Sequence, residues 1–84
     1  MNQCENCELI TSAEGINYFV NHKKSENPRS FGILATVPND AEDTGCVENL
    51  FFTREEACKC CMWLAENQVY PITLSEVLEN FYKF

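Results

Sequence analysis

The sequence predicts a small α+β domain, and three observations lead to that fold class. Three short stretches rich in β-branched and aromatic residues come first, at residues 15–22, 30–37 and 46–52. Two stretches in which apolar residues recur with helical spacing follow, at residues 54–67 and 74–82. The chain has 84 residues, which suits one small domain. We therefore expect a three-stranded antiparallel β-meander followed by two α-helices packed on one sheet face.

The part of the chain before the first expected strand carries little pattern. Residues 1–14 are mostly polar and show no sustained period, so we expect a mobile leader there. In residues 15–22, Ile16, Tyr18 and Val20 alternate with asparagines, except at Phe19, which is typical of a half-buried strand. This stretch would be the first strand and an edge of the sheet.

The next two expected strands are separated from their neighbours by polar loops. Residues 30–37 end before Pro38, which cannot donate a hydrogen bond to a neighbouring strand. Residues 39–45 are rich in turn residues and include three acids, which predicts a loop there. The third strand would then begin at Cys46 and end at residue 52.

Both expected helices have sequence signals at their starts. Thr53 and Glu56 have the spacing of a capping box, with a hydroxyl at the N-cap and a carboxylate at N3. Pro71 cannot continue the first helix without breaking its hydrogen bonds, so a second helix must start beyond it. One apolar face of that helix is formed by Leu74, Val77, Leu78 and Phe81.

The charge of the chain argues against two classes of partner. Thirteen acidic residues against six basic ones give a net charge of −7, so a basic surface for phosphates is missing and we expect no nucleic-acid partner. Anionic membrane surfaces are disfavoured for the same reason, and no segment approaches the roughly 18 apolar residues needed to span a bilayer. The N-terminal residues lack the pattern of a signal peptide, so we expect a cytoplasmic location and no membrane association.

The six cysteines raise the question of a metal or redox site. In a cytoplasmic protein we expect reduced thiols rather than a disulfide framework. Cys4 with Cys7 and Cys58 with Cys61 form two C-x-x-C pairs, so a zinc-binding or thiol-sensing protein that uses these four residues is the alternative interpretation. Against it, 50 residues lie between the two pairs and the second pair falls inside an expected helix. The simpler interpretation is that the helical cysteines pack as small apolar residues and that the protein has no cofactor.

The sequence offers no set of residues for catalysis. His22 is the single histidine, and nothing in the pattern places it beside a thiol. Cys58 falls at the fifth position of the first helix, beyond the first turn where the helix dipole lowers a thiol pKa. The three glycines are isolated, so they do not form a phosphate-binding loop. We therefore expect that the protein is not an enzyme.

Apolar residues on both faces of the expected sheet point to association. Phe19 and Leu34 are each out of phase with the alternating apolar residues of their strands. Two helices can cover one face of the sheet, so we expect a homodimer or a protein partner on the other. Trp63 lies on the polar side of the first helix, where it would be either a lid over the core or an anchor for a partner. Phe19, Leu34 and Trp63 are therefore the candidate interface residues.

Residues 15–82 resemble a family of small proteins of unknown function from Gram-positive anaerobic bacteria. The likeness is carried by the stretches Gly15–Tyr18, Phe31–Ile33, Val47–Leu50 and Asn67–Phe81. The resemblance implies a match over the whole domain and supports the expected architecture, but it implies no activity and no catalytic residues. The interpretation that follows is a cytoplasmic, non-enzymatic protein-interaction module that self-associates through its sheet or its first helix.

Overall fold

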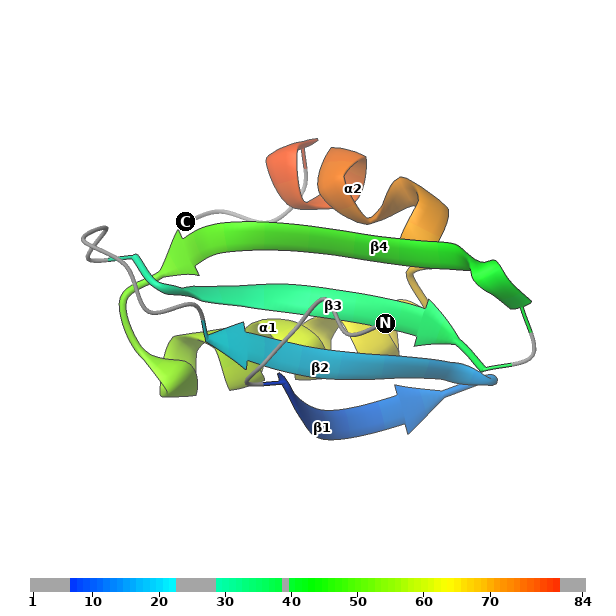
Figure 1. Cartoon of the computed structure of the whole chain (residues 1–84), viewed down its shortest axis with the longest axis horizontal. Helices are drawn as coiled ribbons and strands as arrows, with labels where there is room; N and C mark the ends of the chain where they lie inside the picture. The colour runs from blue at the N-terminus through cyan, green and yellow to red at the C-terminus, as the bar shows by residue number, and fades with distance from the viewer. Residues whose placement is uncertain (1–6, 23–28, 39, 81–84) are drawn as a thin grey trace.

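A computed structural model describes residues 7–22, 29–38 and 40–80, which form one antiparallel sheet and the helices that cover it (Figure 1). The strands pair in chain order as a four-stranded meander, β1-β2-β3-β4. The α+β class, the antiparallel sheet and the two helices are confirmed, whereas the expected number of three strands is wrong. The elements are β1 (Cys7–Ala13), β2 (Ile16–His22), β3 (Phe31–Val37), β4 (Asp40–Phe51), α1 (Arg54–Glu66), the 3-10 turn η1 (Pro71–Thr73) and α2 (Leu74–Asn80).

The additional strand, β1, lies inside the stretch that we expected to be a mobile leader. It is joined to β2 by a two-residue turn in which Glu14 and Gly15 both have positive φ, 53° and 81°. Such turns match the twist of paired strands, and glycine adopts the required φ at little cost. The register shifts between Leu9 and Thr11, so a bulge breaks the alternation that would have marked a strand in the sequence. Because β1 covers one side of β2, the expectation that residues 15–22 form an edge is also wrong.

Strand β4 is 12 residues long and starts six residues before the predicted position. Residues 39–45 were expected to form a loop because of their turn residues, yet Asp40 already pairs with Val37 across a tight connection. Pairing with β3 therefore outweighs the local preference for a turn. Farther along, Asn49 has φ of 59°, and the register shifts between Phe31 and Ile33 of β3. Strand β4 is irregular there, with a bulge before Phe51 pairs again with Phe31.

Helix α1 begins and ends with hydrogen bonds that its sequence encodes. The predicted capping box is confirmed: the Glu56 N–H donates to the Thr53 hydroxyl at 3.2 Å, and the Thr53 N–H donates to the Glu56 carboxylate at 3.3 Å. At the other end, the N–H groups of Gln68 and Val69 donate to the carbonyls of Ala65 and Leu64, both at 3.1 Å. This is a Schellman motif with Gln68, at φ of 50°, in the position that favours glycine.

The second helix is placed by a close contact between its start and β4. Pro71 opens the turn η1, and a Cβ built on Gly45 would lie 2.3 Å from the Pro71 carbonyl oxygen. Only a glycine at position 45 permits this approach. Leu74 and Leu78 of α2 are then buried, as their spacing predicted, while Phe81 lies outside the described residues.

The core lies between one face of the sheet and the two helices. In Figure 1, α1 lies behind the middle of the sheet and α2 lies beside β4. Tyr18 is fully buried there, and its hydroxyl donates to the Val69 carbonyl at 2.7 Å, so it links β2 to the segment that follows α1. The largest buried side chains are Tyr18, Ile16, Ile33, Leu64, Leu74, Leu78, Cys60 and Cys61. Residues from the sheet and from both helices thus share one core, which is consistent with the prediction that both helices pack on the same sheet face.

Candidate functional site

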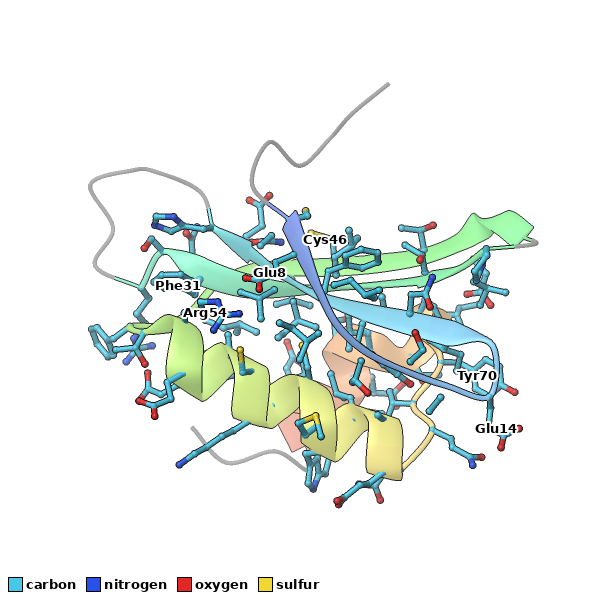
Figure 2. All side chains as sticks on the ribbon, turned by 90° about the horizontal axis from the view of Figure 1, so that it is seen from below. Glu8, Glu14, Phe31, Cys46, Arg54 and Tyr70 are labelled. Carbon is cyan, nitrogen blue, oxygen red and sulfur yellow. The ribbon has the colours of Figure 1, made fainter. Side chains whose placement is uncertain are left out.

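An apolar row crosses all four strands on the face of the sheet that points away from the helices. Leu9 of β1 pairs with Phe19 of β2, Phe19 pairs with Leu34 of β3, and Leu34 pairs with Cys46 of β4. Their neighbours in the strands, such as Val20 and Ile33, point into the core, so alternation directs the row outward. Figure 2 shows Cys46 on the side of the sheet away from α1. We call these four residues the apolar row and this side of the sheet the open face.

The apolar row is accessible. Leu9 is 53% exposed and Cys46 is exposed, while Phe19 and Leu34 are half-buried. The register-paired residues that share the open face with the row are Cys7, Ser12, Asn17, Asn21, Gly32, Thr36 and Thr44. Every one of them is uncharged, in a chain with 19 charged residues, from 13 acids and six bases. Depletion of charge around an apolar centre is typical of a surface that binds another protein.

One buried amide adjoins the end of the apolar row. Asn21 is 4% exposed, and its Nδ2 donates a hydrogen bond to the Cys46 sulfur at 3.3 Å. Its Oδ1 is buried without a hydrogen-bond partner. Gly32 lies between the strands that carry these two residues, and a Cβ at Gly32 would lie 2.9 Å from Oδ1 and 2.3 Å from the Val47 carbonyl oxygen. The missing side chain at Gly32 is therefore what lets Asn21 reach Cys46.

The three interface residues predicted from the sequence do not form a single surface. Phe19 and Leu34 are a direct cross-strand pair on the open face. Trp63 belongs to α1, on the other side of the sheet, where it is partly buried and packs against the core. That packing fits the lid interpretation of Trp63. Whether any of the three binds a partner stays a prediction.

Two members of the apolar row, Leu9 and Cys46, were not predicted as site residues. Leu9 falls in the stretch that was expected to be a leader. Cys46 is the first residue of its expected strand, and its place in the row depends on its register with β3. The signal that could have revealed β1 is the sequence Glu14-Gly15 between two apolar stretches, since a two-residue turn ending in glycine favours a hairpin.

The cysteines of the described residues occupy four kinds of environment. Cys7 is disulfide-bonded, and its partner lies outside the described residues, so the expectation of reduced thiols throughout is wrong for Cys7. Cys60 and Cys61 are fully buried on the core side of α1, and burial raises the pKa of each thiol to about 12. They are therefore protonated at neutral pH and pack as small apolar residues. Cys58 is half-buried, and Cys46 is exposed.

The four cysteines of the zinc hypothesis are not gathered in the structure. Cys58 and Cys61 lie on α1, whereas Cys7 pairs with Asn21 and therefore lies on the open face. Cys4 lies outside the described residues. Within residues 7–22, 29–38 and 40–80, no group of three or more histidine, cysteine or acidic side chains is placed to hold a metal ion. Zinc binding stays a hypothesis that a direct measurement must decide.

A shallow cleft of about 330 Å³ lies where β1 and β2 meet the start of α1, and its lining includes Cys7, His22 and Phe31. Arg54 donates two hydrogen bonds to Glu8 there, one of them at 2.8 Å, and these bonds hold the pKa of the Glu8 carboxyl below its ordinary value. The His22 ring stacks on Phe31, with centroids 4.4 Å apart. The charges of the cleft are paired with each other, and its sulfur belongs to a disulfide. The arrangement links β1 to α1 and supplies no nucleophile with a base beside it.

In the part of the chain that the structure describes, no helix is long and apolar enough to cross a membrane. The likeness to the family of small proteins from Gram-positive anaerobes stays a prediction. Comparisons of the chain with protein-family models, with curated proteins and with solved structures find no match.

Proposed function

We propose that this chain is a cytoplasmic, non-enzymatic protein-interaction module, in which two copies associate through the open faces of their sheets. The observation that carries the proposal is the apolar row, Leu9, Phe19, Leu34 and Cys46, on a face whose register-paired residues are all uncharged. Two sheets that pack face to face lie about 10 Å apart and bury such rows against each other.

Charge favours a second copy as the occupant of the open face. With a net charge of −7, two copies repel each other at most orientations. On the open face the apolar row and the residues paired around it are uncharged. Two copies can therefore approach there with few like charges in contact, although Glu48, two residues after Cys46 in β4, places one acid on the same face. The apolar row also crosses all four strands. If a twofold axis relates two copies whose open faces are opposed, the row of one copy lies on the row of the other. Such an interface is isologous, the commonest arrangement in homodimers.

The edges of the sheet are less suited to association than its face. The outer strand β1 is seven residues long and contains the bulge between Leu9 and Thr11, and both features discourage strand addition. At the other edge, η1 packs against β4 at Gly45. These observations favour the face over the edge as the contact.

The test compares one substitution on the open face with a matched one elsewhere. Phe19→Asp places a charge in the middle of the apolar row, and we expect the dimer to become a monomer, as measured by analytical ultracentrifugation over a range of concentrations. Ile72→Asp is the control, because Ile72 is 82% exposed on η1 and should not be part of the contact. Circular dichroism must show that both variants are folded. A wild-type chain that stays monomeric at millimolar concentration would refute the proposal.

Native mass spectrometry separates this proposal from the zinc alternative. Protein purified without chelator would give a zinc-free dimer if the open face is the functional feature. One zinc ion per chain would favour the alternative that uses Cys4, Cys7, Cys58 and Cys61. In that case removal of the zinc with a chelator would also lower stability markedly, because a metal-linked fold depends on its metal, whereas a chelator leaves the disulfide of Cys7 in place.

A further inference from the structure

The thiol of Cys46 differs from every other thiol in the described residues. Cys60 and Cys61 are fully buried, and Cys58 is half-buried on α1, but Cys46 is exposed on the open face. A disulfide or another electrophile can therefore reach the Cys46 sulfur without any part of the fold opening. Accessibility is the first requirement for a reactive thiol.

The second requirement is an environment that stabilises the thiolate, and Asn21 contributes to it. Its Nδ2 donates a hydrogen bond to the Cys46 sulfur at 3.3 Å, and donated hydrogen bonds favour the charged form of an acceptor. Asn21 is 4% exposed, so this amide is held in place by the surrounding strands. Its orientation leaves Oδ1 buried without a partner, which is normally costly and rare in a folded protein. A buried amide that points its donor at an exposed sulfur favours the thiolate form of that sulfur.

We infer that Cys46 is a modification site that reacts with low-molecular-weight disulfides, with Asn21 as its positioning residue. The Cys46 thiol loses its proton to solvent, and the thiolate attacks one sulfur of the disulfide. A bond forms between the Cys46 sulfur and that sulfur, while the bond between the two sulfurs of the reagent breaks. The second half of the reagent leaves as a thiolate, so one thiol is oxidised and one is released.

The position of Cys46 gives this reaction a consequence for assembly. Cys46 is the β4 member of the apolar row, next to Leu34. An added group at its sulfur would stand above the row and prevent two open faces from closing on each other. Modification of Cys46 therefore controls dimerisation, a step that rests on the proposed function, whereas the reactivity of the thiol does not.

The reactivity is tested with 2,2′-dithiodipyridine, a neutral disulfide whose leaving group absorbs light. The folded chain is used without prior reduction, so that Cys7 stays in its disulfide, and at a concentration below that of dimerisation. We expect one thiol to react at least about tenfold faster than the next, and peptide mapping to place it at Cys46. Cys46→Ser should remove the fast phase, and the matched variant Cys58→Ser should keep it. Asn21→Leu, if folded by circular dichroism, should slow the fast phase several-fold.

Each outcome decides one of the two claims. A first modification at Cys58, the half-buried thiol one turn after Arg54, would overturn the reactive role of Cys46. This result comes from the wild-type chain, so it holds even if Asn21→Leu fails to fold. If Cys46 is modified completely and the dimer persists, control of assembly is refuted while reactivity stands. If Phe19→Asp also leaves the dimer intact, the proposed function itself is wrong.

Discussion

The two faces of the sheet are built from alternate residues of the same strands, yet they differ in composition and in burial. On the helix-covered face, Tyr18, Ile33 and Ala35 are fully buried beneath α1 and α2. On the open face, the residues next to them in sequence, Phe19 and Leu34, are half-buried. The covered face has lost its contact with water, whereas the open face keeps an apolar row at its centre. Burial in the single chain accounts for the apolar residues of the covered face, and the apolar row of the open face requires a separate explanation such as association.

The same difference applies to the thiols. Cys61 lies in the core and behaves as a small apolar residue, while Cys46 lies on the open face beside a buried amide donor. A substitution can therefore alter one face of the sheet and leave the other in place.

The largest effect is expected from alkaline pH, which acts on the covered face. Burial raises the pKa of Cys60, Cys61 and Tyr18 to about 12 in the folded chain, from ordinary values of 9.0 for the thiols and 10.0 for tyrosine. Above pH 9 the unfolded chain releases these protons first, so the free energy of unfolding falls as pH rises toward 12 and is unaffected by these groups below pH 9. We expect complete alkaline unfolding, followed by circular dichroism during pH titration.

The control for alkaline unfolding compares two cysteine variants. Cys61→Ala removes one buried ionisation, so the dependence of stability on pH should become shallower above pH 9. Cys46→Ala changes the open face and should leave that slope as in the wild type. Equal slopes for wild type and Cys61→Ala would show that the buried thiol does not drive the transition.

Adjacent residues of β3 give the second test. Ile33→Ala removes a fully buried side chain and should cost about 2–5 kcal/mol in the free energy of unfolding. Leu34→Ala removes a similar side chain from the open face and should cost less than about 1 kcal/mol in the monomer. Urea unfolding at high dilution measures both, so that dimerisation does not contribute. Similar costs for the two variants would mean that Leu34 is packed within its own chain, and the open face would lose its role as an interface.

Glycine substitutions extend the comparison to the backbone. A Cβ at Gly45, on the covered face, would lie 2.3 Å from the Pro71 carbonyl oxygen, so Gly45→Ala should cost about 1–3 kcal/mol or more. At Gly15, in the turn between β1 and β2, a Cβ meets no atom within 4 Å, and Gly15→Ala should cost about 1 kcal/mol from its positive φ alone. Thermal unfolding of the two variants checks the order, and a larger loss at Gly15 would contradict the close packing of η1 on β4.

Local signals in the sequence were sufficient for some elements and not for others. The capping box at Thr53 located the start of α1, and the alternation around Tyr18 identified β2. Strand β1 was missed because the bulge after Leu9 breaks its period, and the start of β4 was missed because pairing with β3 outweighs its turn-rich composition. Phase within a strand was enough to find Phe19 and Leu34. Leu9 and Cys46 could not be added to them, because their place in the row depends on register between strands far apart in the sequence.

The smallest expected effect concerns the end of α1, where the covered face closes. Gln68 has φ of 50°, a conformation that costs a side-chain-bearing residue more than it costs glycine. Gln68 is exposed, so Gln68→Gly should raise the free energy of unfolding by about 0.5–1 kcal/mol without removing a buried contact. The control is Asn67→Gly, because Asn67 has φ of −99° and its amide donates to the Trp63 carbonyl at 2.8 Å, so glycine there should lower stability. Thermal unfolding of the two variants should therefore show shifts of opposite sign. Shifts in the same direction would mean that the left-handed backbone conformation of Gln68 does not limit the stability of the helix end. The Schellman hydrogen bonds to the carbonyls of Ala65 and Leu64 would then already offset the cost of that conformation.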